Sequence, residues 1–158
     1  MLPRGGMVAT VYEFRDKYKE ELVRSAVAAK PTTPPDVVAA LAGDESEFVR
    51  SAVTRNPSVV PELLVGLADD EDELVRCSVA CSLLAPSEVL AKLAGNANPL
   101  VRVHVGQNPS TPPEVQARLL TDASEFVRWY VGGAECAEQG LAVVYDFRKE
   151  IATRRRNP

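Results

Sequence analysis

The dipeptide Val-Arg recurs every 26 residues along this chain, and no other feature restricts the possible fold as strongly. It occurs at residues 23–24, 49–50, 75–76, 101–102 and 127–128. A segment of this length is too short to bury an apolar face alone, and chains with a fixed period of about 20–50 residues stack such segments on one another. The sequence therefore predicts a single domain of stacked units, each in contact with its neighbours along one axis.

The recurrence divides the 158 residues into four complete units and two ends. The units cover residues 22–47, 48–73, 74–99 and 100–125. Residues 1–21 are expected to form an N-terminal cap. Its helix is predicted from Thr10 to Leu22, because Val11, Phe14, Tyr18 and Leu22 fall at helical spacing. Met7 is a second candidate for the first residue, because the six residues before it carry no periodic pattern.

The C-terminal end departs from the repeat after residue 131. Residues 126–158 are expected to hold a degenerate fifth unit, a polar-faced capping helix and a solvated tail. Leu141, Val144 and Tyr145 supply the apolar spacing of that helix, and Arg154, Arg155 and Arg156 form the tail.

Each unit is predicted to contain two short helices. Asp-x-x-Glu precedes the first helix at residues 44–47, 70–73 and 122–125, where the aspartate can cap free backbone N–H groups and the glutamate can reach back. Asn-Pro at 56–57 and 108–109 is expected to end it, because asparagine tolerates the left-handed conformation and proline cannot continue a helix. Thr-Pro-Pro at 33–35 and 111–113 predicts an N-cap threonine and a proline in the first helical turn of the second helix.

Apolar residues recur at fixed positions of the unit and predict its buried face. In the first helix these are the first, second and sixth positions, for example Phe48, Val49 and Val53. In the second helix they form two columns, Val37, Leu63, Val89 and Val115, and Leu41, Leu67, Leu93 and Leu119. Alternation with a period of two is absent, so the expected class is all-α.

Composition narrows the functional classes. The net charge of −4 and the pI near 5.1 disfavour a broad electrostatic grip on nucleic acid. No run of about 18 apolar residues and no export signal is present, so we expect a cytoplasmic protein without a membrane segment. Three cysteines, Cys77, Cys81 and Cys136, are an odd number, which favours reduced thiols over a disulfide framework.

The repeated strings resemble those of the leucine-rich repeat variant family. Val-Arg-x-x-Val, Asn-Pro-x-Thr-Pro-Pro-Glu-Val and Leu-Ala-x-Asp carry this resemblance, which extends from residue 22 to about residue 131. It implies a right-handed superhelix of alternating α and 3₁₀ helices. The family's first described member also carries an iron-sulfur cluster in a cysteine-rich segment before its repeats, but no cysteine precedes Cys77 here. Unit three departs from the pattern at Ser82-Leu83 and at Asn98-Pro99.

The arginine column is the most regular polar feature, and it comprises Arg24, Arg50, Arg76, Arg102 and Arg128. One hypothesis is a cationic stripe that binds a phosphate backbone or an acidic partner. The other is a structural role, because a glutamate lies three residues before most of these arginines, a spacing that places the pair on one helix face, and each arginine could also bind carbonyls at the neighbouring unit's turn. Arginine occurs in every unit, including the ends, which favours the structural hypothesis.

Two smaller groups are also candidate sites. His104, Trp129 and Tyr130 can form an aromatic patch for a partner, or Trp129 and Tyr130 can fill the end of the core. Cys77 and Cys81 lie four residues apart and could bind a metal with Cys136, but a structural zinc site needs four ligands and His104 is the one histidine. We therefore expect no metal and no cofactor.

No catalytic arrangement stands out in the sequence, so we do not expect an enzyme. The leading hypothesis is a non-enzymatic scaffold or protein-interaction module whose repeated surface binds a protein partner. The alternative is binding of nucleic acid or an acidic partner through the arginine column, helped by the basic tail.

Overall fold

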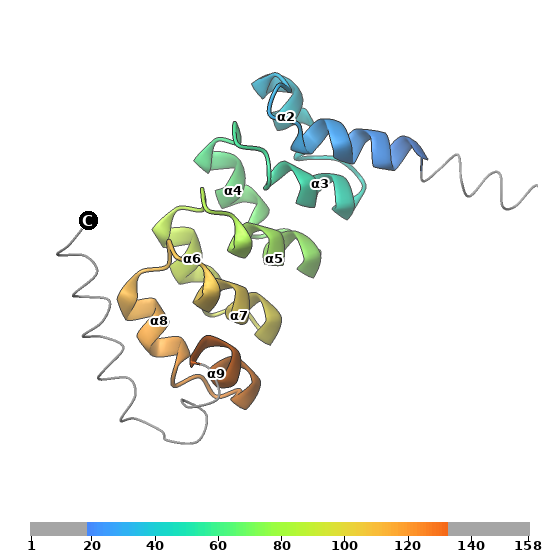
Figure 1. Cartoon of the computed structure of the whole chain (residues 1–158). Coiled ribbons are helices and arrows are strands. Elements are labelled where there is room, and N and C mark those ends of the chain that lie inside the picture. The colour runs from blue at the N-terminus through green and yellow to red at the C-terminus, as the bar shows by residue number, and fades with distance from the viewer. Residues whose placement is uncertain (1–18, 133–158) are drawn as a thin grey trace, which may run out of the picture.

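The computed structural model describes residues 19–132. Residues 19–29 are helical, and eight further helices follow in chain order within this part of the chain (Figure 1). They are α2 (Pro35–Leu41), α3 (Glu47–Val53), α4 (Pro61–Leu67), α5 (Glu73–Cys81), α6 (Ser87–Leu93), α7 (Pro99–Gln107), α8 (Pro113–Leu119) and α9 (Glu125–Gly132). The expected N-terminal cap before residue 19 and the C-terminal capping helix after residue 132 lie outside the described residues.

The helices form two layers along one axis, as an α-solenoid requires. Helices α3, α5, α7 and α9 pack on one another in sequence, and α2, α4, α6 and α8 lie along the other side of the stack (Figure 1). Between residues 19 and 132 there is no strand, so the predicted all-α class is confirmed. All helical segments in this range are α-helices, in place of the alternating 3₁₀ helices that the resemblance implied.

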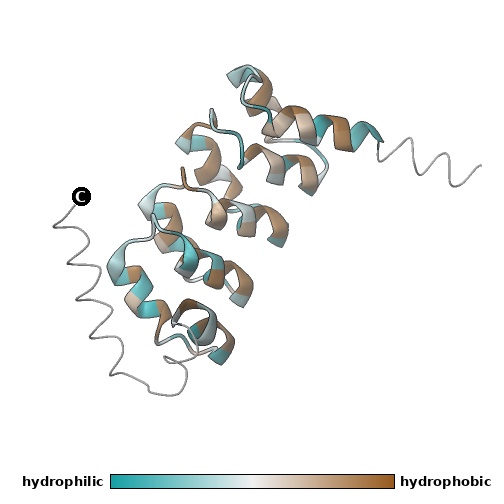
Figure 2. Ribbon diagram, viewed as in Figure 1, coloured by the Kyte–Doolittle hydropathy of each residue, from teal (hydrophilic) through white to brown (hydrophobic). Residues whose placement is uncertain are grey.

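The core follows the repeat closely. The second position is completely buried at Val49, Val75, Val101 and Val127, and so is the sixth position at Val53, Val79 and Val105. In the first unit the same positions are exposed, Val23 at 56% and Val27 at 38%. In the second helices the predicted columns are buried at Leu67, Leu93, Leu119, Val89 and Val115. Leu41 and Leu63 are only partly buried, and Val37 is 37% exposed. Leu64 and Leu90 are also fully buried, one residue after the predicted column. Figure 2 shows that every helix of the stack contributes hydrophobic residues.

The first position was wrongly predicted to be buried. The residues at this position are 40–66% exposed. Along the chain the values are Leu22 66%, Phe48 49%, Leu74 40%, Leu100 47% and Phe126 40%. Adjacent residues of an α-helix point about 100° apart, so the second and sixth positions share the inward face and the first position lies at its rim. We call these five residues the apolar column.

The threonines before the second helices also differ from the prediction. Thr33 and Thr111 do not cap α2 and α8; their hydroxyls donate to the carbonyls of Val27 (2.6 Å) and Val105 (2.5 Å), six residues earlier. Pro35 and Pro113 do begin their helices, as predicted. Each buried threonine therefore ties the end of the first helix to the start of the second, which fixes the angle between them.

The asparagines after the first helices have a different role from the one predicted. Asn108 has extended backbone angles, with φ −74° and ψ 122°, so its left-handed conformation was wrongly predicted. Its Nδ2 donates to the carbonyls of Ala80 (2.7 Å) and Ser82 (2.9 Å) in the preceding unit. Asn56 makes the same pair of bonds to Ala28 and Lys30, at 2.7 and 3.0 Å. At both sites a buried asparagine side chain thus joins its unit to the backbone of the preceding unit.

Candidate functional site

The arginine column is joined to a second column that the sequence analysis did not identify as its partner. The guanidinium of Arg50 donates from Nε and Nη2 to the two carboxylate oxygens of Asp70, at 2.8 and 2.9 Å. Arg24 and Asp44, and Arg102 and Asp122, form the same bidentate pairs. The aspartate lies 20 residues after its arginine, at the turn that precedes the first helix of the next unit.

The same arginines also hold the turn before their own helix. Arg50 Nη1 donates to the carbonyl oxygens of Asp44 (2.8 Å) and Glu45 (3.1 Å). Arg76, Arg102 and Arg128 make equivalent pairs of bonds, each to carbonyls five and six residues earlier. Arg50 and Arg102 therefore each connect the turn before their own helix with the turn before the next unit. We call this series of contacts the Arg-Asp ladder.

The expected helical Glu-Arg pairs contribute little to this arrangement. In the described residues only Glu73 and Arg76 form one, at 3.9 Å, and the glutamates do not reach back to cap their helices. The aspartates do accept a backbone N–H, but from the residue two later: Ser46, Asp72 and Ser124. The aspartate carboxylate therefore holds its own turn and the preceding arginine together.

Electrostatics favour the ionised form of these carboxyls. Burial opposes ionisation of Asp70, but the hydrogen bonds from Arg50 and from the Asp72 N–H outweigh it and lower the pKa of Asp70 below its ordinary value. The pKa values of Asp44 and Asp122 are lowered for the same reasons. The hydrogen bond to Asp70 raises the pKa of Arg50. Both side chains are largely covered, with 12% of Arg50 and 8% of Asp70 exposed.

The Arg-Asp ladder is interrupted in unit three. Asn96 occupies the position of the aspartates, and its Oδ1 accepts the Asn98 N–H at 3.0 Å. Arg76 keeps its bonds to the carbonyls of Asp70 and Glu71, but its buried Nε has no hydrogen-bond partner. The residue at the corresponding position for Arg128 is number 148, which lies outside the described residues. Of the four arginines whose partner position is described, Arg76 is therefore the one without a carboxylate in the next turn.

Replacing Asn96 by aspartate is expected to stabilise the protein by about 1–2 kcal/mol, because a carboxylate would satisfy Arg76 Nε with a charged hydrogen bond. Urea unfolding at neutral pH measures the difference. In a double-mutant cycle, Asn96→Asp should give no gain in an Arg76→Met background. An equal gain with and without Arg76 would show that the effect does not come from this pair.

The second candidate surface is the apolar column with the aromatic residues at its C-terminal end. The ring of Phe126 lies 4.6 Å from that of Tyr130, and Trp129 meets Tyr130 edge-on at 4.7 Å between centroids. Trp129 and Tyr130 are 46% and 45% exposed, so within the described residues they do not fill a core. We call Phe126, Trp129 and Tyr130 the aromatic cluster. His104 of α7, half-buried, occupies the same position of the preceding unit as Tyr130.

Comparison with known families agrees with this repeat. Residues 24–80 match the model of the Leucine Rich Repeat Variant domain. The repeats of residues 24–80 are leucine-rich repeat variants. The match covers α2, α3, α4 and most of α5, and the 26-residue recurrence of Val-Arg continues beyond it into α7 and α9. No curated protein and no solved structure matches the chain.

Cys77 and Cys81 do not belong to a metal site within residues 19–132. Cys77 is half-buried and Cys81 is exposed, and both are free thiols on α5. Burial raises the pKa of both thiols, which keeps them protonated and weakly nucleophilic at neutral pH. Between residues 19 and 132 no three His, Cys, Asp or Glu side chains are placed to bind one metal ion. Cys136 lies outside the described residues.

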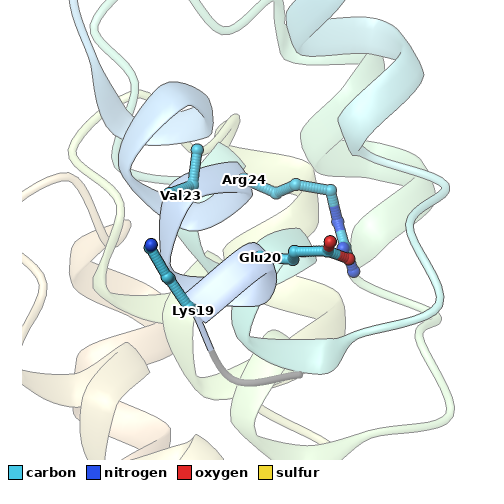
Figure 3. A pocket seen from close by; sticks show the side chains of 4 residues that line it. All are labelled: Lys19, Glu20, Val23 and Arg24. Atoms are coloured by element: carbon cyan, nitrogen blue, oxygen red, sulfur yellow. The ribbon is translucent and has the colours of Figure 1, made fainter. Parts of the chain in front are cut away.

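One hollow opens at the N-terminal end of the described helical stack. It has a volume of about 630 Å³, and the described residues that line it are Lys19, Glu20, Val23 and Arg24 (Figure 3). The guanidinium of Arg24 already binds Asp44, so Arg24 does not offer this hollow an unpaired positive charge. None of the helices in the described part of the chain is sufficiently long and apolar to span a bilayer.

Proposed function

We propose that this chain is a non-enzymatic interaction module that binds a protein partner through the apolar column and the aromatic cluster. The observation that carries the proposal is the exposure of one large apolar side chain at the same position of five successive units. Isolated exposed apolar residues are common, but an ordered series of them is typical of an interaction surface. The aromatic cluster adds tyrosine and tryptophan, which are enriched among the residues that dominate binding energy.

The spacing of the apolar column suits a long partner segment. Helices that pack side by side are separated by about 8–10 Å, so four steps from Leu22 to Phe126 cover about 40 Å. A single segment lying along the stack can therefore make several similar contacts, one per unit. Each contact is modest, and their sum within one molecule supplies the affinity.

The state of the arginines weighs against the alternative, nucleic-acid binding through the arginine column. Arg24, Arg50 and Arg102 each already donate two hydrogen bonds to one aspartate carboxylate. The Nη1 atoms of Arg50, Arg76, Arg102 and Arg128 are bound to backbone carbonyls. A phosphate would have to displace these internal partners, and its favourable charge contact would be offset by their loss. The arginine column is better explained as part of the scaffold that presents the apolar column.

Replacing Phe48, Leu74 and Leu100 together by serine should weaken capture of a partner by at least about tenfold, because each serine removes exposed apolar area available for burial. The measurement is affinity capture from cell extract with the full chain, followed by quantification of the proteins retained. A matched variant, Val60→Ser with Val65→Ser, removes two apolar side chains of similar exposure from the α4 side of the stack.

The proposal requires that the same partner is lost with the triple variant and retained with the α4 variant. Circular dichroism of both variants checks that the fold is intact. Equal retention of every captured protein by the wild type and the triple variant would contradict a role for the apolar column.

A further inference from the structure

We propose that the segment bound by the apolar column is a basic amphipathic helix, lying along the stack axis with its apolar residues spaced seven apart. This inference rests on the proposed function, because it names the chemistry of the partner for that same surface.

The charge next to the apolar column is negative. A glutamate immediately precedes four of its five residues: Glu21 before Leu22, Glu47 before Phe48, Glu73 before Leu74 and Glu125 before Phe126. The turns before α3 and α5 add Glu45, whose side chain is 90% exposed, and Glu71, which is also exposed. The carbonyls of these two residues bind arginines, but their carboxylates remain at the surface.

The nearest positive charges do not cancel this acidity. Arg24, Arg50 and Arg102, two residues beyond the apolar column in each helix, are committed to Asp44, Asp70 and Asp122. Those pairs are neutral as units. Arg76 and Arg128 have no such aspartate within the described residues, and Arg76 lies 3.9 Å from Glu73, but the glutamates beside the apolar column outnumber these two arginines, so the local charge remains negative. Charged rims around an apolar centre set the choice of partner and the rate of encounter, and this rim favours lysine and arginine.

The step of the stack selects a helix over an extended segment. Units advance by about 10 Å, and a helix rises about 1.5 Å per residue, so residues seven apart are about 10.5 Å apart on one face. An extended segment covers about 10 Å in three residues, but residues three apart point to opposite faces. A helix with an apolar residue at each seventh position therefore meets successive members of the apolar column without changing face.

The inference is tested with two tryptophan-free helical peptides of about 24 residues that share leucines at every seventh position and differ only in their flanking residues, lysine in one and glutamate in the other. Trp129 is the one tryptophan of the chain and lies beside Phe126, so its fluorescence reports binding to the full-length protein. We expect the lysine peptide to bind at least about tenfold tighter at low salt, with the difference shrinking as salt screens the charges. Glu47→Gln with Glu125→Gln should reduce that preference.

Four outcomes would overturn the inference, the last of them together with the proposed function. Equal affinity of the two peptides would remove the charge preference and leave the apolar column as a binding surface. Failure of both peptides, while a partner is still captured through Phe48, Leu74 and Leu100, would exclude the basic helix and keep the proposed function. Self-association of the full chain that is abolished by the triple serine variant would identify a second copy as the occupant. If both peptides fail and no column-dependent partner is captured, the proposed function falls as well.

Discussion

Replacing Leu93 by alanine is expected to lower the free energy of unfolding by about 2–5 kcal/mol, because the truncation leaves a cavity in a packed interior. Leu93 is 2% exposed at the end of α6 and belongs to the continuous core of the stack. Its neighbours on both layers are short helices that have little stability of their own, so they cannot collapse around the cavity without shifting the next unit. Urea unfolding followed by circular dichroism measures the loss.

The chain supplies a matched control for this truncation. Leu83 lies in the turn after α5, where the corresponding turns of the second and fourth units have proline, and it is 68% exposed. Leu83→Ala makes the same chemical change without a cavity, and its effect should stay within about 0.5 kcal/mol. Similar losses for the two variants would mean that the core does not lie between the layers as described.

The fold could be predicted from the sequence because the repeat states the same information several times. Val49, Val75, Val101 and Val127 are buried as the recurrence predicted, and α2 and α8 begin at Pro35 and Pro113. An error at one position, in contrast, repeats in every unit. Phe48 was assigned to the core because it is large and apolar, but hydrophobicity does not show whether a residue at the rim of a helix face is covered by the next unit.

Contacts between units were harder to predict than helices. Local spacing suggested Glu47 as the partner of Arg50, since residues three apart share a helix face. The actual partner, Asp70, lies 20 residues away and reaches Arg50 only because the next unit stacks beside it. The recurrence of aspartate at residues 44, 70 and 122 was visible in the sequence, but a period alone does not tell which two columns meet. The buried bonds of Asn56 and Asn108 escaped prediction for the same reason.

The Arg-Asp ladder gives the second large effect. Asp70→Asn keeps the shape of the side chain but removes the charge and turns a donor toward Arg50, so it should lower the free energy of unfolding by about 2–3 kcal/mol. The chain already contains this arrangement at Arg76 and Asn96, which shows that the fold tolerates it. Asn96→Asp in the Asp70→Asn background should recover most of the loss. The double variant lacks the carboxylate that binds Arg50 but gains one that can bind Arg76.

The effect of Asp70→Asn should also depend on pH in a defined direction. The pKa of Asp70 is lowered in the folded protein, so its contribution to stability is fully present above the ordinary value of about 3.9 and is lost as the pH falls through the lowered folded-state value. The wild type and the variant should therefore differ most at neutral pH and converge below about pH 3.9 in urea unfolding measured across this range. A difference that stays constant through the acid range would mean that the Asp70 carboxylate does not hold Arg50, and that the turns between units are joined mainly by the arginine-carbonyl bonds.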